Sequence, residues 1–275
     1  MLSVERCDLK VLFEKQRQYR IPLFQRRYVW DREKQWEPLW EDVQTTAERY
    51  LSVPNAKPHF LGAVVFKLEA TGSRALDARA VIDGQQRLTT MQLLIIAARD
   101  VCASYGDEAS PLEADLRFLV QNTNGLTKPD DAHKVWPTQV DQEHFRRVVA
   151  AGSPEALIKT YQEAHYADSD DTNDLESEIP IRDAYLFFFE SIRNWVDQAE
   201  ASDRIKRLAV LRDVIYTGLI FVVIDLSQDD DPQVIFEALN ARGTPLLESE
   251  LVKNFLLHRA ETRGLDSRAL YQRYW

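Results

Sequence analysis

The segment Ala80–Cys102 reads AVIDGQQRLTTMQLLIIAARDVC and joins a short apolar run to a long one through a polar turn. Residues 80–82 predict the end of a strand, and residues 88–102 are apolar on nearly every side, which predicts a buried helix. The turn gathers a carboxylate, a glycine, two carboxamides, a guanidinium and two hydroxyls: Asp83, Gly84, Gln85, Gln86, Arg87, Thr89 and Thr90. Because backbone N–H groups at a helix start are unpaired, this turn suits a phosphate or the edge of a nucleotide.

The same turn also has a purely structural interpretation. Asp83 would cap the helix, and Thr89 and Thr90 would bond to nearby backbone groups. The residue types alone leave both interpretations open.

Periodicity and turn residues predict the elements around this segment. Asp31 is expected to cap a helix that reaches Tyr50 and whose inner face carries Trp36, Leu39, Trp40 and Val43. Strands are expected at residues 59–68, 80–82 and 216–226, the last of them buried on both faces because it is apolar throughout. Further helices are expected at residues 112–121, 139–150, 154–166, 181–199, 205–214, 232–243 and 247–259, with a solvated acidic loop at 168–178.

Composition indicates a soluble protein of the cytoplasm. The chain has 275 residues, of which 45% are hydrophobic and 28% are charged. We find no apolar run near the roughly 18 residues that span a bilayer, and the N-terminus lacks the apolar stretch of a signal peptide. Cys7 and Cys102 are too few and too far apart for a metal framework, so we expect structural thiols.

The charge is segregated along the chain. A formal net charge of −10 argues against a surface that binds nucleic acid indiscriminately. From Lys10 to Arg32, however, seven basic residues stand against two acidic ones, which predicts a local basic strip. Acidic surface outside the strip would favour a directed path for DNA.

Two other polar clusters lie where a strand or loop meets a helix. The first comprises Gln25, Arg26, Arg27, Tyr28 and Trp30, and the second Glu237, Asn240, Arg242 and Gly243. Each also has a structural interpretation, as a solvated basic loop and as a helix C-terminus. The five histidines are scattered and form no nuclease signature.

Three segments together resemble the N-terminal domain of GmrSD-type restriction endonucleases. They are Pro22–Trp30 (PLFQRRYVW), Ile82–Thr90 (IDGQQRLTT) and Ile235–Gly243 (IFEALNARG), followed by LVKN at residues 251–254. The order and spacing agree, and the resemblance runs from about Lys10 to Arg259. The helical middle carries no part of it.

The resemblance implies an α+β fold, with a small ParB/sulfiredoxin-like mixed-sheet core and a large helical subdomain. Residues 1–275 would form one domain, in which 1–105 and 206–275 are the core and 106–205 a helical insertion. A C-terminal HNH-type nuclease domain, absent from this chain, would be its partner. The domain would hydrolyse a nucleoside triphosphate with Mg²⁺, sense modified DNA, and couple turnover to DNA cleavage in anti-phage defence.

On this resemblance the site residues take three roles. Catalytic roles fall to Asp83, Gln85, Gln86 and Arg87; nucleotide or phosphate binding to Gly84, Arg87, Thr89, Thr90, Asn240 and Arg242; and DNA binding to Gln25, Arg26, Arg27, Tyr28 and Trp30. Asp83 would either hold Mg²⁺ or orient the attacking water. Arginine suits phosphate because it forms paired, charge-assisted hydrogen bonds.

Two other functions stay open. The domain would instead be a binding module for modified DNA, carrying a phosphorothioate or a glucosylated base, without essential hydrolysis; or it would be a ParB-like nuclease. The sequence does not choose among GTP, ATP and UTP.

Overall fold

The computed structural model describes residues 3–23, 25–53, 56–69, 72, 75–167 and 178–227, together with residues 256, 265 and 270. Six strands form one sheet: β1 (Ser3–Asp8), β2 (Arg17–Arg20), β3 (His59–Leu68), β4 (Asp77–Asp83), β5 (Val135–Trp136) and β6 (Leu219–Leu226). The α-helices of the described part are α1 (Leu9–Phe13), α2 (Glu37–Ser52), α3 (Gln85–Ser104), α4 (Ser110–Val120), α5 (Gln142–Ala151), α6 (Pro154–Ala167), α7 (Pro180–Asp197) and α8 (Arg204–Asp213). Five shorter turns of helix connect them: the π-helices η1 (Arg32–Trp36) and η5 (Val214–Gly218), and the 3₁₀ helices η2 (Asp107–Ala109), η3 (Pro129–Ala132) and η4 (Ala201–Asp203).

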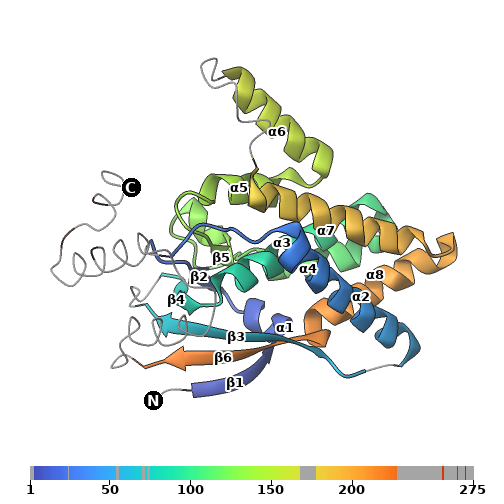
Figure 1. Ribbon diagram of the computed structural model, residues 1–275, viewed down its shortest axis with the longest axis horizontal. Coiled ribbons are helices and arrows are strands. Elements are labelled where there is room, and N and C mark those ends of the chain that lie inside the picture. The colour runs from blue at the N-terminus through green and yellow to red at the C-terminus, as the bar shows by residue number, and fades with distance from the viewer. Residues whose placement is uncertain are drawn as a thin grey trace.

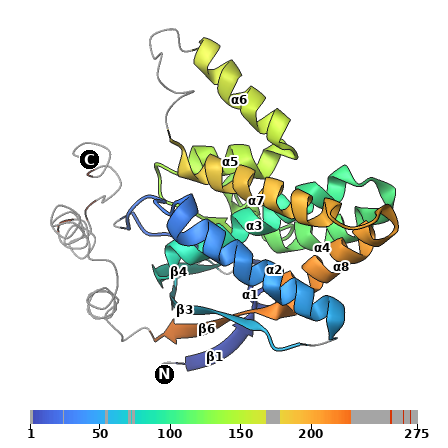
Figure 2. The same cartoon turned by 45° about the vertical axis from the view of Figure 1, so that its right-hand side comes forward.

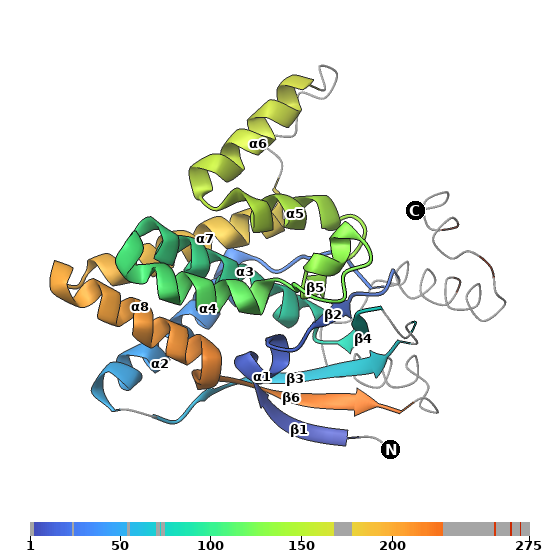
Figure 3. The ribbon, with the colours of Figure 1, turned by 180° about the vertical axis from the view of Figure 1, so that it is seen from behind.

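The sheet is mixed, with the strand order β1-β6-β3-β4-β2-β5. The β6–β3, β4–β2 and β2–β5 pairs are parallel, and β1–β6 and β3–β4 are antiparallel. Figures 1 and 3 show the described helices gathered on one side of this sheet, and Figure 2 shows α6 projecting from the helical layer. The fold is therefore α+β, as predicted.

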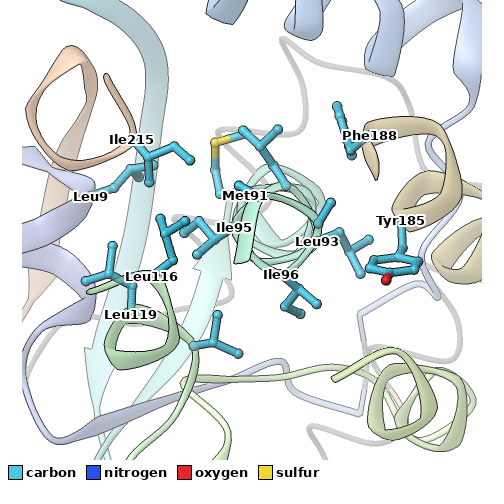
Figure 4. Close-up of a cluster of buried hydrophobic side chains, with 14 of the residues drawn as sticks. Leu9, Met91, Leu93, Ile95, Ile96, Leu116, Leu119, Tyr185, Phe188 and Ile215 are labelled. Carbon is cyan, nitrogen blue, oxygen red and sulfur yellow. The ribbon is translucent and has the colours of Figure 1, made fainter. Parts of the chain in front are cut away.

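Helix α3 is the centre of the core. Seventeen of its twenty residues are buried, which confirms the prediction of a helix apolar on all sides. Figure 4 shows why: Met91, Leu93 and Ile95 point outward from α3 in different directions, toward α4 on one side and α7 on another. The polar turn is thus attached to a rigid element.

Most predicted elements are confirmed, with small shifts at their ends. Asp31 does cap the helical segment η1–α2, since its side chain accepts from the Lys34 N–H. Helix α3 begins at Gln85, earlier than the apolar run, and β6 begins only after the π-helix η5. Cys7 and Cys102 are free and buried, as expected of structural thiols.

Three strands were not predicted. β1 and β2 lie in the N-terminal segment, and β5 lies within the region predicted to be a helical insertion, although it pairs with β2 in the sheet. The division into core and insertion stays a prediction, as does the likeness of the core to ParB. The predicted helix at 232–243, the predicted helix at 247–259 apart from residue 256, and nearly all of the acidic loop lie outside the described residues. In the described part, no helix combines the length and apolarity needed to cross a membrane.

Candidate functional site

Gly84 makes the turn from β4 into α3 possible. Its φ is +86°, in the left-handed region that side chains disfavour. A Cβ at this position would lie 2.7 Å from Val64 Cγ1 and 3.1 Å from the Ala63 carbonyl oxygen. Glycine is needed both for the backbone angle and because β3 packs directly against the turn.

Asp83 is not the helix cap, so this part of the structural interpretation is wrong, although Thr90 does bond to nearby backbone as that interpretation expected. Gly84 occupies the N-cap position and makes no side-chain cap bond, so no capping side chain accepts from the first N–H groups of α3. The first N–H groups of a helix have no partner within it, so this end carries partial positive charge. The first backbone N–H groups of α3 therefore have no capping side chain.

Three polar side chains of the turn keep bonding capacity. The Asp83 carboxylate is half-buried and the Gln85 carboxamide is nine-tenths buried, yet neither bonds to any described residue. Arg87 donates from Nη1 to the Ala63 carbonyl oxygen at 3.1 Å, and forms no salt bridge within the described part of the chain. These groups are the candidates for contact with an anionic ligand.

Gln86 instead binds the basic cluster. Its Oε1 accepts from the Val29 N–H at 2.9 Å, and its Nε2 donates to the Arg27 carbonyl oxygen at 3.0 Å. Gln25 adds a third tie, because its Nε2 donates to the Ile82 carbonyl oxygen at 2.9 Å. The first two sequence clusters therefore meet in space, with the loop 25–30 bonded to both ends of the turn.

Tyr28 anchors the same loop from inside. Its side chain is buried, and its Oη accepts from Trp36 Nε1 at 2.9 Å and lies 2.7 Å from Thr90 Oγ1. The Thr90 hydroxyl in turn donates to the Gln86 carbonyl oxygen at 2.8 Å, so the Tyr28 hydroxyl donates to Thr90. Burial raises the pKa of Tyr28 far above its usual value, so the phenol stays neutral.

Asp141 is a site residue that sequence reasoning missed. Its carboxylate accepts from the Tyr28 N–H at 2.8 Å and from the Thr138 hydroxyl at 2.5 Å. The side chain is buried, and burial raises the pKa of Asp141. Asp141 lies in the helical middle, 113 residues from Tyr28, so no local pattern pointed to it.

The structure thus divides the predicted site residues into two groups. Five are buried, and none presents its side chain to a ligand in this conformation: Gln25, Gln86, Tyr28, Thr89 and Thr90. Six remain at or near the surface or keep free bonding groups: Arg26, Arg27, Trp30, Asp83, Gln85 and Arg87. Arg26 and Arg27 form no salt bridge with a described residue. Asn240 and Arg242 lie outside the described residues.

The oxygen ligands that the turn offers fit Mg²⁺, which substrate phosphates help to hold, better than they fit a metal held by protein ligands alone. Among the described residues no group of three metal-binding side chains comes together. Magnesium in nucleotide sites is usually held by one or two carboxylates together with substrate phosphates. A lone, unpartnered Asp83 carboxylate beside a helix N-terminus meets that requirement.

The fold and this site define an α+β protein whose central helix begins in an uncapped polar turn beside a basic loop. Over residues 9–257, the chain matches the family described as GmrSD restriction endonuclease, N-terminal domain. It belongs to this family, and so to the proteins of restriction systems. No curated protein matches the sequence.

Proposed function

We propose that this chain is the nucleotide-hydrolysing and DNA-sensing domain of a restriction protein, and that its turnover controls DNA cleavage by a separate HNH-type nuclease domain. The observation that carries the proposal is the unpaired Arg87 beside the uncapped start of α3. A helix N-terminus and a guanidinium both favour phosphate oxygens. The basic loop bonded to the same turn supplies a contact for DNA.

In the proposed reaction the turn holds and orients the phosphates. Arg87 would bind phosphate oxygens and stabilise charge that develops during phosphoryl transfer, and the Gly84 and Gln85 N–H groups would bind from the helix end. Asp83 would hold Mg²⁺, which would supply positive charge beside the phosphates. The Gln85 carboxamide can donate and accept together, so it suits positioning of the attacking water.

DNA would bind along the basic loop. Arg26 and Arg27 have no salt bridge to break with described residues before they contact a phosphate backbone. Gln86 in the first turn of α3 bonds to the backbone of this loop, so movement of the loop would be transmitted to the start of the helix. This link supports coupling between DNA binding and nucleotide turnover.

Phosphate release tests the proposal. Release from GTP, ATP and UTP is measured with Mg²⁺, with and without duplexes that carry phosphorothioates or glucosylated cytosines. We expect Arg87→Ala to lower release by about a hundredfold or more, as for loss of one group that stabilises the transition state. Arg117→Ala is the matched control, because Arg117 is an exposed arginine that pairs with Glu113 on helix α4 and does not line the turn. Equal release by wild type and Arg87→Ala would refute the assignment.

A binding module without essential hydrolysis is the second candidate. The exposure of Arg27 and the lack of salt bridges at Arg26 and Arg27 favour it. Under this function, Arg26→Ala with Arg27→Ala abolishes binding of modified duplex at unchanged melting temperature, while Arg87→Ala has no effect on the biological readout, phage restriction by the full-length protein. Loss of restriction in Arg87→Ala would favour the hydrolase.

A further inference from the structure

A pocket of about 240 Å³ opens beside Arg87 and combines Arg87 and Trp30 with residues of β3 that the sequence did not single out. Its walls come from the side of α3, the beginning of β3, and the segment η1–α2. The lining residues that matter here are Trp30, Gln35, Asp42, His59, Phe60 and Arg87. The pocket is smaller than the roughly 300–1,000 Å³ of sites that enclose a drug-sized ligand, so it suits one ring system better than a whole nucleotide.

Arg87 is fixed at the wall of this pocket by a special feature of β3. The pairing of β3 with β6 shifts register between Phe60 and Gly62, and Gly62 has φ +102°. A Cβ at Gly62 would lie 3.4 Å from Arg87 Nε, an ordinary contact, so it is the backbone angle that requires glycine here, while the guanidinium lies over the strand. One Nη group is used by the Ala63 carbonyl, and the other donors remain for an anion.

Two aromatic rings line the same pocket. Phe60 is 59% exposed, and Trp30 is partly buried against the core. Neither ring stacks on another aromatic ring in the described part of the chain. An exposed ring beside an arginine without a salt bridge suits a ligand that has both a ring and a phosphate. The ring of the ligand would stack on the aromatic side chain, and such stacking tolerates any base.

The remaining wall carries groups that can bond to the edge of a ring. His59 Nε2 lies 3.5 Å from Asp42 Oδ2, and Gln35 Oε1 accepts from the Asp31 N–H, which leaves the Gln35 amide donors. Donors and acceptors therefore stand at the rim of an otherwise apolar space.

We propose that this pocket binds the base of a single nucleotide, stacked on Phe60, and that the phosphate of the same nucleotide lies against Arg87. The proposal rests on the proposed function, because Arg87 is the phosphate contact in both. The base would come from a free nucleotide or from a nucleotide unstacked out of DNA, and the two sources share this chemistry. The pocket would thus add Phe60 and His59 to the site and give Trp30, predicted as a DNA contact, the role of binding the base.

Binding of tripolyphosphate and of GTP to the full chain, in Mg²⁺ and by calorimetry, separates ring from phosphate contacts. We expect Phe60→Ala to weaken GTP binding by at least about fivefold, the low end for loss of one base–aromatic stack, and to leave tripolyphosphate binding unchanged. Phe60→Trp keeps a ring and should restore GTP binding. Phe118→Ala, which removes another exposed phenylalanine on α4, is the matched control.

The second arm identifies the source of the base. The same variants are titrated with single-stranded DNA and with phosphorothioate duplex, and weakening of DNA binding alone would place a DNA base in the pocket. The base pocket is refuted if Phe60→Ala binds GTP and DNA as tightly as wild type does. The phosphate site stands in that case if Arg87→Ala still weakens the binding of tripolyphosphate. If wild type binds no nucleotide, tripolyphosphate or DNA, both proposals fail.

Discussion

Replacing Gly84 with alanine should destabilise the turn on which the candidate site is built. The new methyl group would be 2.7 Å from Val64 Cγ1, a separation that folded proteins do not tolerate, and it would occupy a backbone with φ +86°. The left-handed conformation costs about 1–2 kcal/mol for a side chain, and overpacking a buried contact typically costs about 1–3 kcal/mol. We expect a total loss of about 2–5 kcal/mol.

Thermal and urea unfolding measure this loss. For a chain of this size, about 2–5 kcal/mol corresponds to a fall of roughly 4–20 °C in the melting temperature. Gly152→Ala is the matched control, because Gly152 has φ +73° but a Cβ there would meet nothing within 4 Å. It should therefore report only the backbone cost. The excess loss in Gly84→Ala is the contribution of the contact with β3.

A double-mutant cycle with Val64→Ala completes the test. Val64 is fully buried, so Val64→Ala costs stability alone, but it removes the atom that the new methyl group would strike. The two losses should therefore add to more than the loss in the double variant. If Gly84→Ala is no less stable than Gly152→Ala, the argument that β3 packs against the turn is wrong.

Two further predictions concern the supports of the site, and a third concerns Lys134, which is buried next to β5 and donates to the Lys15 carbonyl oxygen. Tyr28→Phe removes a hydrogen-bond partner from Trp36 Nε1 and from the Thr90 hydroxyl. It should lower the free energy of unfolding in urea by about 1–3 kcal/mol. An unchanged free energy of unfolding would indicate that water replaces the hydroxyl. Asp141→Ala should accelerate amide hydrogen exchange at Tyr28 and its neighbours more than in the rest of the core, and uniform acceleration would contradict its role as an anchor. Burial lowers the pKa of Lys134 from 10.5 to about 8, so the folded state binds this proton more weakly than the unfolded state. The cost of burying the charged lysine is therefore fully present below pH 8 and absent above pH 10.5. Between these values the free energy of unfolding of wild type should rise by up to about 3 kcal/mol relative to that of Lys134→Met. If the two proteins show the same dependence of stability on pH, the assignment is refuted.

The elements with strong periodicity were predictable, and the weakly patterned ones were not. Helix α3 and strand β6 bury most of their residues, so their apolar runs identified them. Strand β1 is short and mostly exposed, and its hydrogen-bonding partner β6 lies more than 200 residues away, as the Ser3–Asp225 pair shows. Nothing local in SVERCD requires a strand; the free edge of β6 does.

The same distinction holds for the site. Residue types identified the turn and the basic loop, but not which side chains stay available. Gln85 and Gln86 are adjacent and chemically identical, yet Gln86 is bonded to the loop 25–30 while Gln85 bonds to no described residue. Phe60 was predicted only as part of a strand, because its exposure beside Arg87 depends on the bulge at Gly62.

Local chemistry therefore specified a polar turn between a strand and a buried helix, since burial patterns and helix starts depend on neighbouring residues. The division of that turn into supports and free groups came from packing. The partners that decide it are far away in the chain: Val29 is 57 residues from Gln86, and Asp141 is 113 residues from Tyr28. Hydrogen bonds across such separations form only when the sheet and helices bring the segments together, so the groups that remain for a ligand emerge only in the folded protein.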